Sequence, residues 1–292
     1  MRYFVSLFCI AIFANAMTDY YPIINNYIYN SLNKIDIFLS DSNISAHPVY
    51  TIRSSIDAAR ESSQNTLFRF NIKAKIKLPR TMRHFKLFFE DFKQKNSIDT
   101  LNGRSVQDSI NNNSYLFGLQ YHAKFPLRFR LGMKLNSFDS YAGVGMQKEQ
   151  TWHTLSFLYG FDYRYYIRRK DDLSLHANIY KTLNNAFTLG FENSYRFEQK
   201  GEVRHQAIDG LHLYHNWNAS LQNIWRADVY MNSDTNDNFR LDYYYFGCDI
   251  IKTFVKKRYF LQISPAVLWR EPRDFRPSYR FMVSFGVNFY KK

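Results

Sequence analysis

After residue 49, apolar and polar side chains alternate one by one along most of the chain. This two-residue period is that of a β-strand with one apolar face, whereas an amphipathic helix repeats every 3.6 residues. Segment 67–78 shows it most clearly, with apolar side chains at every second position: Phe68, Phe70, Ile72, Ala74, Ile76 and Leu78. The same alternation returns in 113–125, 127–136, 154–168 and 278–290. These segments predict antiparallel strands.

Weaker segments extend the pattern: 49–60, 83–92, 141–149, 172–182, 186–199, 203–215, 218–231, 239–252 and 257–270. The long helices of an α/β protein are missing from the same region. Single-chain bacterial barrels have even strand numbers and both ends in the periplasm. We therefore expect an all-β, transmembrane antiparallel up-and-down β-barrel of 12–14 strands. The full set gives 14, and 12 remain if 49–60 and one short neighbour fail to form.

The predicted connections fall into two groups once 49–60 is taken to run outward. Short ones lie on the periplasmic side: 79–81, 125–126, 183–185, 216–217 and 254–256. Longer polar ones lie outside: 93–112, 232–238 and 272–277. Outer-membrane barrels have this asymmetry between short periplasmic turns and longer outer loops, so loop length supports both the architecture and its orientation.

Composition also favours a membrane barrel. Aromatic residues make up 18% of the chain and hydrophobic residues 46%, yet the mean hydropathy is -0.43. A helical span needs about 20 consecutive apolar residues, whereas a barrel strand needs apolar residues only at alternate positions. Aromatic rings near predicted strand ends suit the headgroup level: Tyr163, Tyr165, Trp225, Tyr259 and Trp269. The alternative is aromatic packing inside a soluble β-sandwich.

The chain begins with Met1-Arg2, an apolar run from Tyr3 to Phe13, and then Ala14-Asn15-Ala16. This order is typical of a secretory signal peptide, residues 1–16, cut after Ala16. The alternative is a short membrane anchor or a buried helix. Removal of 1–16 takes Cys9 with it, so Cys248 alone remains and no intrachain disulfide is possible.

Residues 17–48 form a separate segment before the barrel, which we place at 49–292. Apolar residues recur at roughly helical spacing there: Tyr27, Ile28, Leu32, Ile35, Phe38 and Leu39. We expect a periplasmic amphipathic helix and linker, with the helix plugging or bracing the lower mouth of the barrel.

The chain is strongly basic, with a formal net charge of +14. Alternation places many cations on the lumenal face: Arg69, Lys73, Lys75, Lys77, Lys86, Arg128, Arg130, Lys134, Arg164, Arg168, Arg196, Arg226, Arg240, Arg270 and Arg280. Fewer acids share that face: Glu90, Asp162, Glu192, Asp228 and Asp242. Such a lumen would favour small anions. The alternative is that cations, acids and tyrosines pair and close it.

Nothing in the sequence predicts an enzyme or a cofactor. His153 and Ser156 lie three residues apart, and so do His212 and His215. In a strand this spacing puts the two side chains on opposite faces, so neither pair can form one reactive site. His122, His176 and His212 are expected to point inward, and we interpret them as polar lumen residues rather than as a catalytic or metal site. No phosphate loop or metal-spaced cluster occurs, and we expect no nucleic-acid partner.

Three motifs carry a resemblance to a known family. They are the segment Asn33–Asp41, the hairpin from Ile76-Lys77-Leu78-Pro79-Arg80-Thr81 into Phe85–Glu90, and Tyr259–Pro265 with Trp269-Arg270-Glu271. In these the chain resembles an uncharacterised proteobacterial outer-membrane β-barrel protein family. The resemblance implies fold and location but no chemistry. The alternating end Val283–Tyr290 also resembles the signal read by the barrel-assembly machinery, although Lys291 and Lys292 follow the last aromatic residue.

The leading functional hypothesis is therefore a porin-like channel for small anionic solutes in the outer membrane of a Gram-negative bacterium. Its partners would be outer-membrane lipids, the assembly machinery and small anions. A closed structural or surface-binding barrel, with outer loops 93–112 and 232–238 meeting a partner, is the alternative. An outer-membrane hydrolase ranks third.

Export can be tested directly on the protein purified from membranes of a Gram-negative host. Cleavage after Ala16 should give an intact mass and an N-terminal sequence that begin at Met17. An unprocessed N-terminus at Met1 would contradict the signal peptide and favour an anchor.

Overall fold

The alternating segments form strands because their two-residue period lets one face bury polar groups while the other remains apolar. The computed structural model describes residues 2–38, 40, 47–62, 66–79, 85–91, 115–122, 126–168, 170–199, 204–233, 238–271 and 274–291. The predicted outer loop 93–112 lies outside the described residues, as do most of the predicted connections 79–81 and 232–238.

One helix precedes 14 strands, so the larger predicted strand number is confirmed. The helix is α1 (Arg2–Phe38). The strands are β1 (Val49–Glu61), β2 (Leu67–Lys77), β3 (Phe85–Asp91), β4 (Tyr115–His122), β5 (Leu127–Lys134), β6 (Asp139–Trp152), β7 (Leu155–Tyr166), β8 (Lys170–Thr182), β9 (Phe187–Glu198), β10 (His205–Asn218), β11 (Leu221–Ser233), β12 (Phe239–Phe254), β13 (Tyr259–Arg270) and β14 (Pro277–Lys291).

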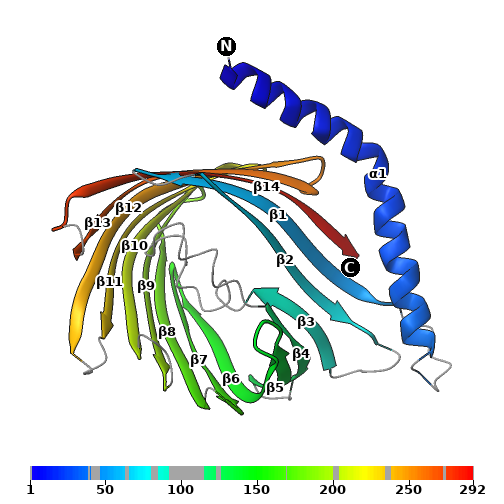
Figure 1. Ribbon diagram of the computed structural model, residues 1–292, viewed down its shortest axis with the longest axis horizontal. Coiled ribbons are helices and arrows are strands. Elements are labelled where there is room, and N and C mark those ends of the chain that lie inside the picture. Colours follow the sequence, from blue (N-terminus) through cyan, green and yellow to red (C-terminus); the bar gives the residue numbers. More distant parts are fainter. Residues whose placement is uncertain are drawn as a thin grey trace.

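The sheet is a closed barrel in which each strand pairs antiparallel with its sequence neighbours and β1 pairs with β14 (Figure 1). We call the end where β1 begins and β14 finishes the turn end, and the opposite end the loop end. Connections such as 153–154, 183–186, 219–220 and 255–258 are short at the turn end. The expected asymmetry holds for 92–114, which joins β3 and β4 at the loop end, whereas the other loop-end connections have three to six residues and 78–84 at the turn end has seven.

Burial follows the alternation. On β2, Phe68 is 69% exposed whereas the next residue, Arg69, is only 6% exposed. Exposed apolar residues on the outward face recur around the wall, and we call them the outer belt: Ile56, Phe68, Phe70, Phe117, Phe129, Leu131, Leu175, Ile179, Phe191, Leu211, Trp225, Phe246, Ile250 and Phe281. The buried charges lie on the opposite, lumenal face. This protein is therefore apolar outside and charged inside, the reverse of a soluble globular protein.

Several predicted boundaries were wrong. Strand β10 continues through the expected turn 216–217 and reverses only at 219–220. The turn predicted at 254–256 lies at 255–258, where Val255, Lys256 and Lys257 all have positive φ. A four-residue reversal of this kind needs left-handed backbone that alternation does not reveal.

A bulge changes the faces near the loop end of β12. Tyr230 pairs with Tyr243 but Met231 pairs with Leu241, so the register between β11 and β12 shifts by one residue at Asp242. The prediction that Asp242 faces the lumen assumed uninterrupted alternation, and the bulge interrupts the alternation at this residue.

The helix does not plug the barrel, which corrects that part of the prediction. It runs outside the ring of strands, beside the ends of β1 and β14 (Figure 1). Tyr21 of α1 is buried against Tyr259 and Val287, and its ring stacks on Phe289 at 5.2 Å. These partners lie on the outward face of β13 and β14, so the helix braces the barrel from outside.

Two further contacts fix α1 in place. The hydroxyl of Tyr50, a buried residue at the start of β1, donates to Asn25 at 2.9 Å. The hydroxyl of Tyr21 donates to the backbone oxygen of Asn288 at 3.0 Å. Both helix residues follow the predicted cleavage site, so its use would leave these contacts intact.

No helix in the described part of the chain is both long enough and apolar enough to span a membrane.

A buried ion cluster fastens the seam where the first and last strands meet. Glu61, at the loop end of β1, is 1% exposed. Its carboxylate accepts hydrogen bonds from Arg270 of β13, at 3.0 Å for Nη2, and from Arg280 of β14, at 2.8 Å for Nη2. Ser278 donates a further bond at 2.7 Å. One carboxylate therefore ties three strands together across the closure.

Replacing Glu61 by alanine should destabilise the barrel, because Arg270 and Arg280 would lose their buried counter-charge. Losses of this kind cost about 3–5 kcal/mol. The measurement is urea unfolding in detergent micelles. The matched control is Glu149→Ala, at an exposed position on β6, expected within about 0.5 kcal/mol of wild type. Equal stability of both variants would contradict a structural role for the seam cluster.

Candidate functional site

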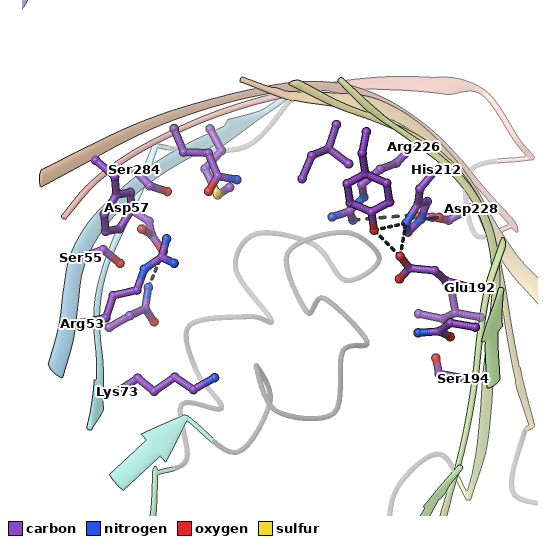
Figure 2. Close-up of a pocket in the computed structure, with 18 of the residues that line it drawn as sticks. Arg53, Ser55, Asp57, Lys73, Glu192, Ser194, His212, Arg226, Asp228 and Ser284 are labelled. Atoms are coloured by element: carbon purple, nitrogen blue, oxygen red, sulfur yellow. Dashed lines mark hydrogen bonds and ion pairs between the residues drawn. The ribbon is translucent and has the colours of Figure 1, made fainter. Parts of the chain in front are cut away.

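The lumen holds a cavity of about 410 Å³. Two facing walls supply its charged groups (Figure 2). One wall is made by β1 and β2, with Arg53, Asp57 and Lys73. The other is made by β9, β10 and β11, with Glu192, His212, Tyr214, Arg226 and Asp228. These strands are far apart in the sequence and face one another only because the sheet closes.

The β9–β11 wall is a continuous hydrogen-bond network centred on His212. Its Nε2 lies 2.7 Å from Asp228 and its Nδ1 lies 3.2 Å from Glu192. Glu192 also accepts hydrogen bonds from Tyr180, at 3.0 Å, and from Tyr214. Both imidazole nitrogens can donate to carboxylates only when the ring is protonated. The geometry therefore fits an imidazolium held between two carboxylates.

The β1–β2 wall is arranged differently. The Arg53 guanidinium lies 3.9 Å from the ring centre of Phe260, on the buried face of β13. Such a cation–π contact orients the guanidinium but does not neutralise it. Asp57 accepts a hydrogen bond from Asn71, and the Lys73 side chain extends toward the cavity (Figure 2). This wall thus presents Arg53, Lys73 and one acid, Asp57, to the space between the walls.

Most of the predicted lumenal arginines are brought together with acids. Arg128 and Arg130 both bind Asp162, at 3.0 and 2.9 Å. Arg164 and Arg196 both approach Asp172, at 3.6 and 3.1 Å. These residues are buried or nearly so, and their pairing supports the alternative that lumenal charges fill the wall.

Two further arginines show the same behaviour. Arg226, at the cavity, lies between Asp228 and Asp249, at 3.6 and 3.3 Å. Arg280 is held by Glu61 in the seam. Arg69 and Lys134 are also buried on the lumenal face, at 6% and 2% exposure. The arginines therefore act first as structural partners of acids on neighbouring strands.

The remaining predicted lysines lie on β2 and β3. Lys75 and Lys77 are exposed and Lys86 is half-buried. Among the described residues, none of these three takes part in an ion pair with an acid, and Lys86 is close enough to experience the charges of the other two. Unlike the arginines, these three lysines form a cationic group that no acid in the described part of the chain pairs with. With Arg53 and Lys73 we call them the basic arc.

Two expectations differ in detail, and a third, for Glu90, is not tested. Arg168 lies in the β7–β8 turn, exposed, and its guanidinium donates to the backbone oxygen of Ser137 at 3.3 Å. Arg240 is a rim residue that lies 3.8 Å from Glu271, with its side chain 54% exposed. The side chain of Glu90 falls outside the described residues.

Sequence reasoning missed several important residues. Arg53 was overlooked because β1 alternates weakly, with Ser54-Ser55 in its middle. Asp172, Asp249 and Glu61 were not assigned to the lumen, although each lies two or four residues from an inward position on its strand. Parity with His176 could have found Asp172, whereas the bulge at Asp242 reverses the parity that Arg240 and Asp242 predict for Asp249. The pairing partners of these acids come from other strands.

The histidines do not converge on a reactive centre among the described residues. His153 occupies a turn with φ 53, and Ser156 shares a hydrogen bond with Thr151 at 3.2 Å. The side chain of His122 lies outside the described residues. No group of three His, Cys, Asp or Glu in the described ranges could hold a metal ion.

Comparisons with known proteins give similarity of shape. No protein-family model and no curated protein matches the chain. The solved structure of OccK5 (OpdH) of Pseudomonas aeruginosa has 9% identity and a TM-score of 0.47, covering 84% of this chain and 98% of that one. The outer membrane channel DcaP of Acinetobacter baumannii has 8% identity and a TM-score of 0.46, covering 86% of this chain and 100% of that one. A KdgM porin in complex with disordered oligogalacturonate has 8% identity and a TM-score of 0.37, covering 80% of this chain and 98% of that one. At this level the likeness concerns the barrel alone, and the family resemblance of the three sequence motifs stays a prediction.

Proposed function

We propose that the protein is an integral outer-membrane β-barrel that admits small anionic solutes through its lumen. The membrane location is supported by the outer belt, which surrounds the wall with Phe, Leu, Ile and Trp side chains. A soluble protein would not leave so large an apolar surface in water. In lipid this surface is favourable, and closure pairs the strand edges around the ring, although the described pairing of β2 with β3 covers only Ala74–Ile76.

Aromatic side chains at both barrel ends also support this location. At the turn end, Trp152 and Trp217 are 66% and 60% exposed, next to short turns. At the loop end, Tyr165 and Tyr279 are exposed, together with Phe138 in the β5–β6 turn. Transmembrane barrels carry such girdles at both interfaces. Tyr259, predicted for a girdle, is instead buried beneath α1.

The anion preference rests on one observation, the difference between the two cavity walls. Cations on the β9–β11 wall are matched by Asp228, Glu192 and Asp249. On the β1–β2 wall the described cavity lining holds one acid, Asp57, beside Arg53 and Lys73, so we expect a positive field on that side of the cavity. Charged side chains that line a narrow path favour ions of opposite sign.

A closed structural barrel is the second candidate, and a specific observation favours it. The arginines of β5, β7 and β9 fold onto Asp162 and Asp172 instead of extending freely into water. Paired side chains of this size occupy lumenal space. Conductance separates the two candidates.

The protein purified from the outer membrane should give stable, anion-selective steps in planar bilayers under a salt gradient. Lys73→Gln, which removes one charge from the cavity wall, should lower the anion-to-cation permeability ratio by up to about fivefold. That is the effect of roughly 1 kcal/mol, the Coulomb energy of two charges 4 Å apart in water.

The control for this measurement is Lys148→Gln, on the outward face of β6 opposite Tyr159. It removes the same charge without touching the lumen and should leave selectivity unchanged. A barrel with no steps would move the function to a structural or surface-binding role, and cation-selective steps would contradict the role of the basic arc.

The outer belt can be tested by placing a charge in it. Leu211, 51% exposed and central on β10, should tolerate arginine poorly, with a loss of about 2–4 kcal/mol in folding stability in lipid vesicles. Leu183→Arg makes the same substitution at an equally exposed turn-end position, where the cost is about 0–1 kcal/mol. Equal effects at both positions would argue against a hydrocarbon layer around the belt.

A further inference from the structure

Helix α1 carries an apolar stripe on a side that the barrel does not cover. Tyr20, Ile24, Tyr27, Ile35 and Phe38 follow one another at spacings of three, four and eight residues, which places them on one side of a helix. All are exposed, with Tyr27 at 74% and Phe38 at 88%. A helix that only braced the barrel in water would not need this stripe.

The helix has two other faces of different character. The docked face carries Tyr21, Asn25 and Tyr29, spaced by four residues, all in contact with the barrel or with His47 just before it. A third face carries Asn26 and Asn30, both exposed, with exposed Ile23 and Ile37 toward its two ends. Around Asn26 and Asn30, one face of the helix therefore meets protein, one is apolar and one is polar. That combination fits a helix at the boundary of hydrocarbon and water, lying against an inserted barrel.

A basic cluster borders the docked face. Arg258 lies 4.4 Å from the ring centre of Tyr21, and the Lys291 amine lies 3.4 Å from that of Tyr29. Lys256 and Lys257, in the same β12–β13 turn as Arg258, are exposed. The turn also exposes Val255, immediately after Phe254. Apolar and basic side chains thus meet at the turn end, as they do on surfaces that bind acidic lipids.

We propose that the docked part of α1 lies in the headgroup layer at the turn end, with its apolar stripe in lipid, and that Lys256, Lys257, Arg258 and Lys291 bind acidic phospholipid headgroups there. Burial of the exposed stripe in hydrocarbon is favourable, and the four cations complement phosphate. The inference rests on the proposed membrane location and is independent of conductance.

Quenching of site-specific probes in vesicles tests the placement of the helix. The full-length gene, with Cys9 and Cys248 replaced by alanine, is expressed in a Gram-negative host, and single cysteines are labelled with bimane. Tyr27→Cys reports the stripe and Asn30→Cys the polar face, while Phe281→Cys on the outer belt reports insertion. The vesicles contain phosphatidylcholine and phosphatidylglycerol, with one lipid at a time brominated in its acyl chains.

We expect bromolipid to quench the probes at 27 and 281, and aqueous iodide to quench the probe at 30. Quenching at 281 with iodide access at 27 would overturn the inference while leaving the membrane location standing. Absence of lipid quenching at both 27 and 281 would overturn the membrane location, and the inference with it.

The lipid preference is tested with the probe at 27. Brominated phosphatidylglycerol should quench it more strongly than brominated phosphatidylcholine at equal content. The double variant Lys256→Gln/Lys257→Gln should reduce this preference by up to about fivefold for each lysine, since each basic residue near an acidic surface contributes on that scale. These side chains are exposed, and the turn uses only their backbone oxygens, which accept from Tyr290 and Asn288.

Arg276→Gln, an exposed charge near the loop end, is the matched control and should leave the preference unchanged. Equal quenching by the two lipids in the wild-type protein, or an equal response to Arg276→Gln, would overturn the role of the basic cluster.

Discussion

Closure of the sheet by the pairing of β1 with β14 is the constraint on which the rest of this protein depends. It runs in unbroken antiparallel register from Tyr50 opposite Lys291 to Glu61 opposite Arg280. An open sheet would leave a row of backbone donors and acceptors unpaired at each edge, which hydrocarbon does not tolerate. The two strands are separated by nearly the whole chain. Glu61, which accepts hydrogen bonds from Arg270 and Arg280, adds side-chain contacts at one end of this pairing.

Closure also decides what the alternating faces become. The apolar face turns outward and forms the outer belt, while charged side chains are crowded into the lumen. Crowding brings Asp162 within reach of both Arg128 and Arg130, and Asp172 within reach of Arg164 and Arg196. Because removing one partner of such a pair leaves a buried charge, these residues stabilise the wall before they can act on a solute. The basic arc on β1–β3 differs, and the proposed selectivity depends on that difference.

Besides the outer belt and the lumen, the barrel has a third kind of surface, the part at the turn end on which α1 docks. Its docked face replaces lipid over part of β13 and β14, where Tyr259 and Val287 are covered by Tyr21. The same docking orients the other two helix faces. A role at the headgroup layer and a role in the lumen can therefore coexist in one chain, since they use opposite sides of the wall.

The sequence by itself determined the class of fold and the two faces of the strands with clear alternation, and it favoured 14 strands over 12. These follow from local alternation, because every second residue must face lipid whatever its partners are. Phe68 and Arg69 illustrate this, since their types alone give their opposite exposures. Alternation also placed Lys73 and Arg226 on the face that lines the cavity.

Only the tertiary structure decided which charges meet and where the helix lies. The association of Glu61 with Arg270 and Arg280 spans more than 200 positions of sequence, and strand periodicity carries no information on such distant partners. The bulge at Asp242 arises from a shift between two strands and has no local period. The docking of Tyr21 on Phe289 needs a surface that exists only once β13 and β14 have paired. The faces of each strand are local properties, whereas the site and its supports are set by closure.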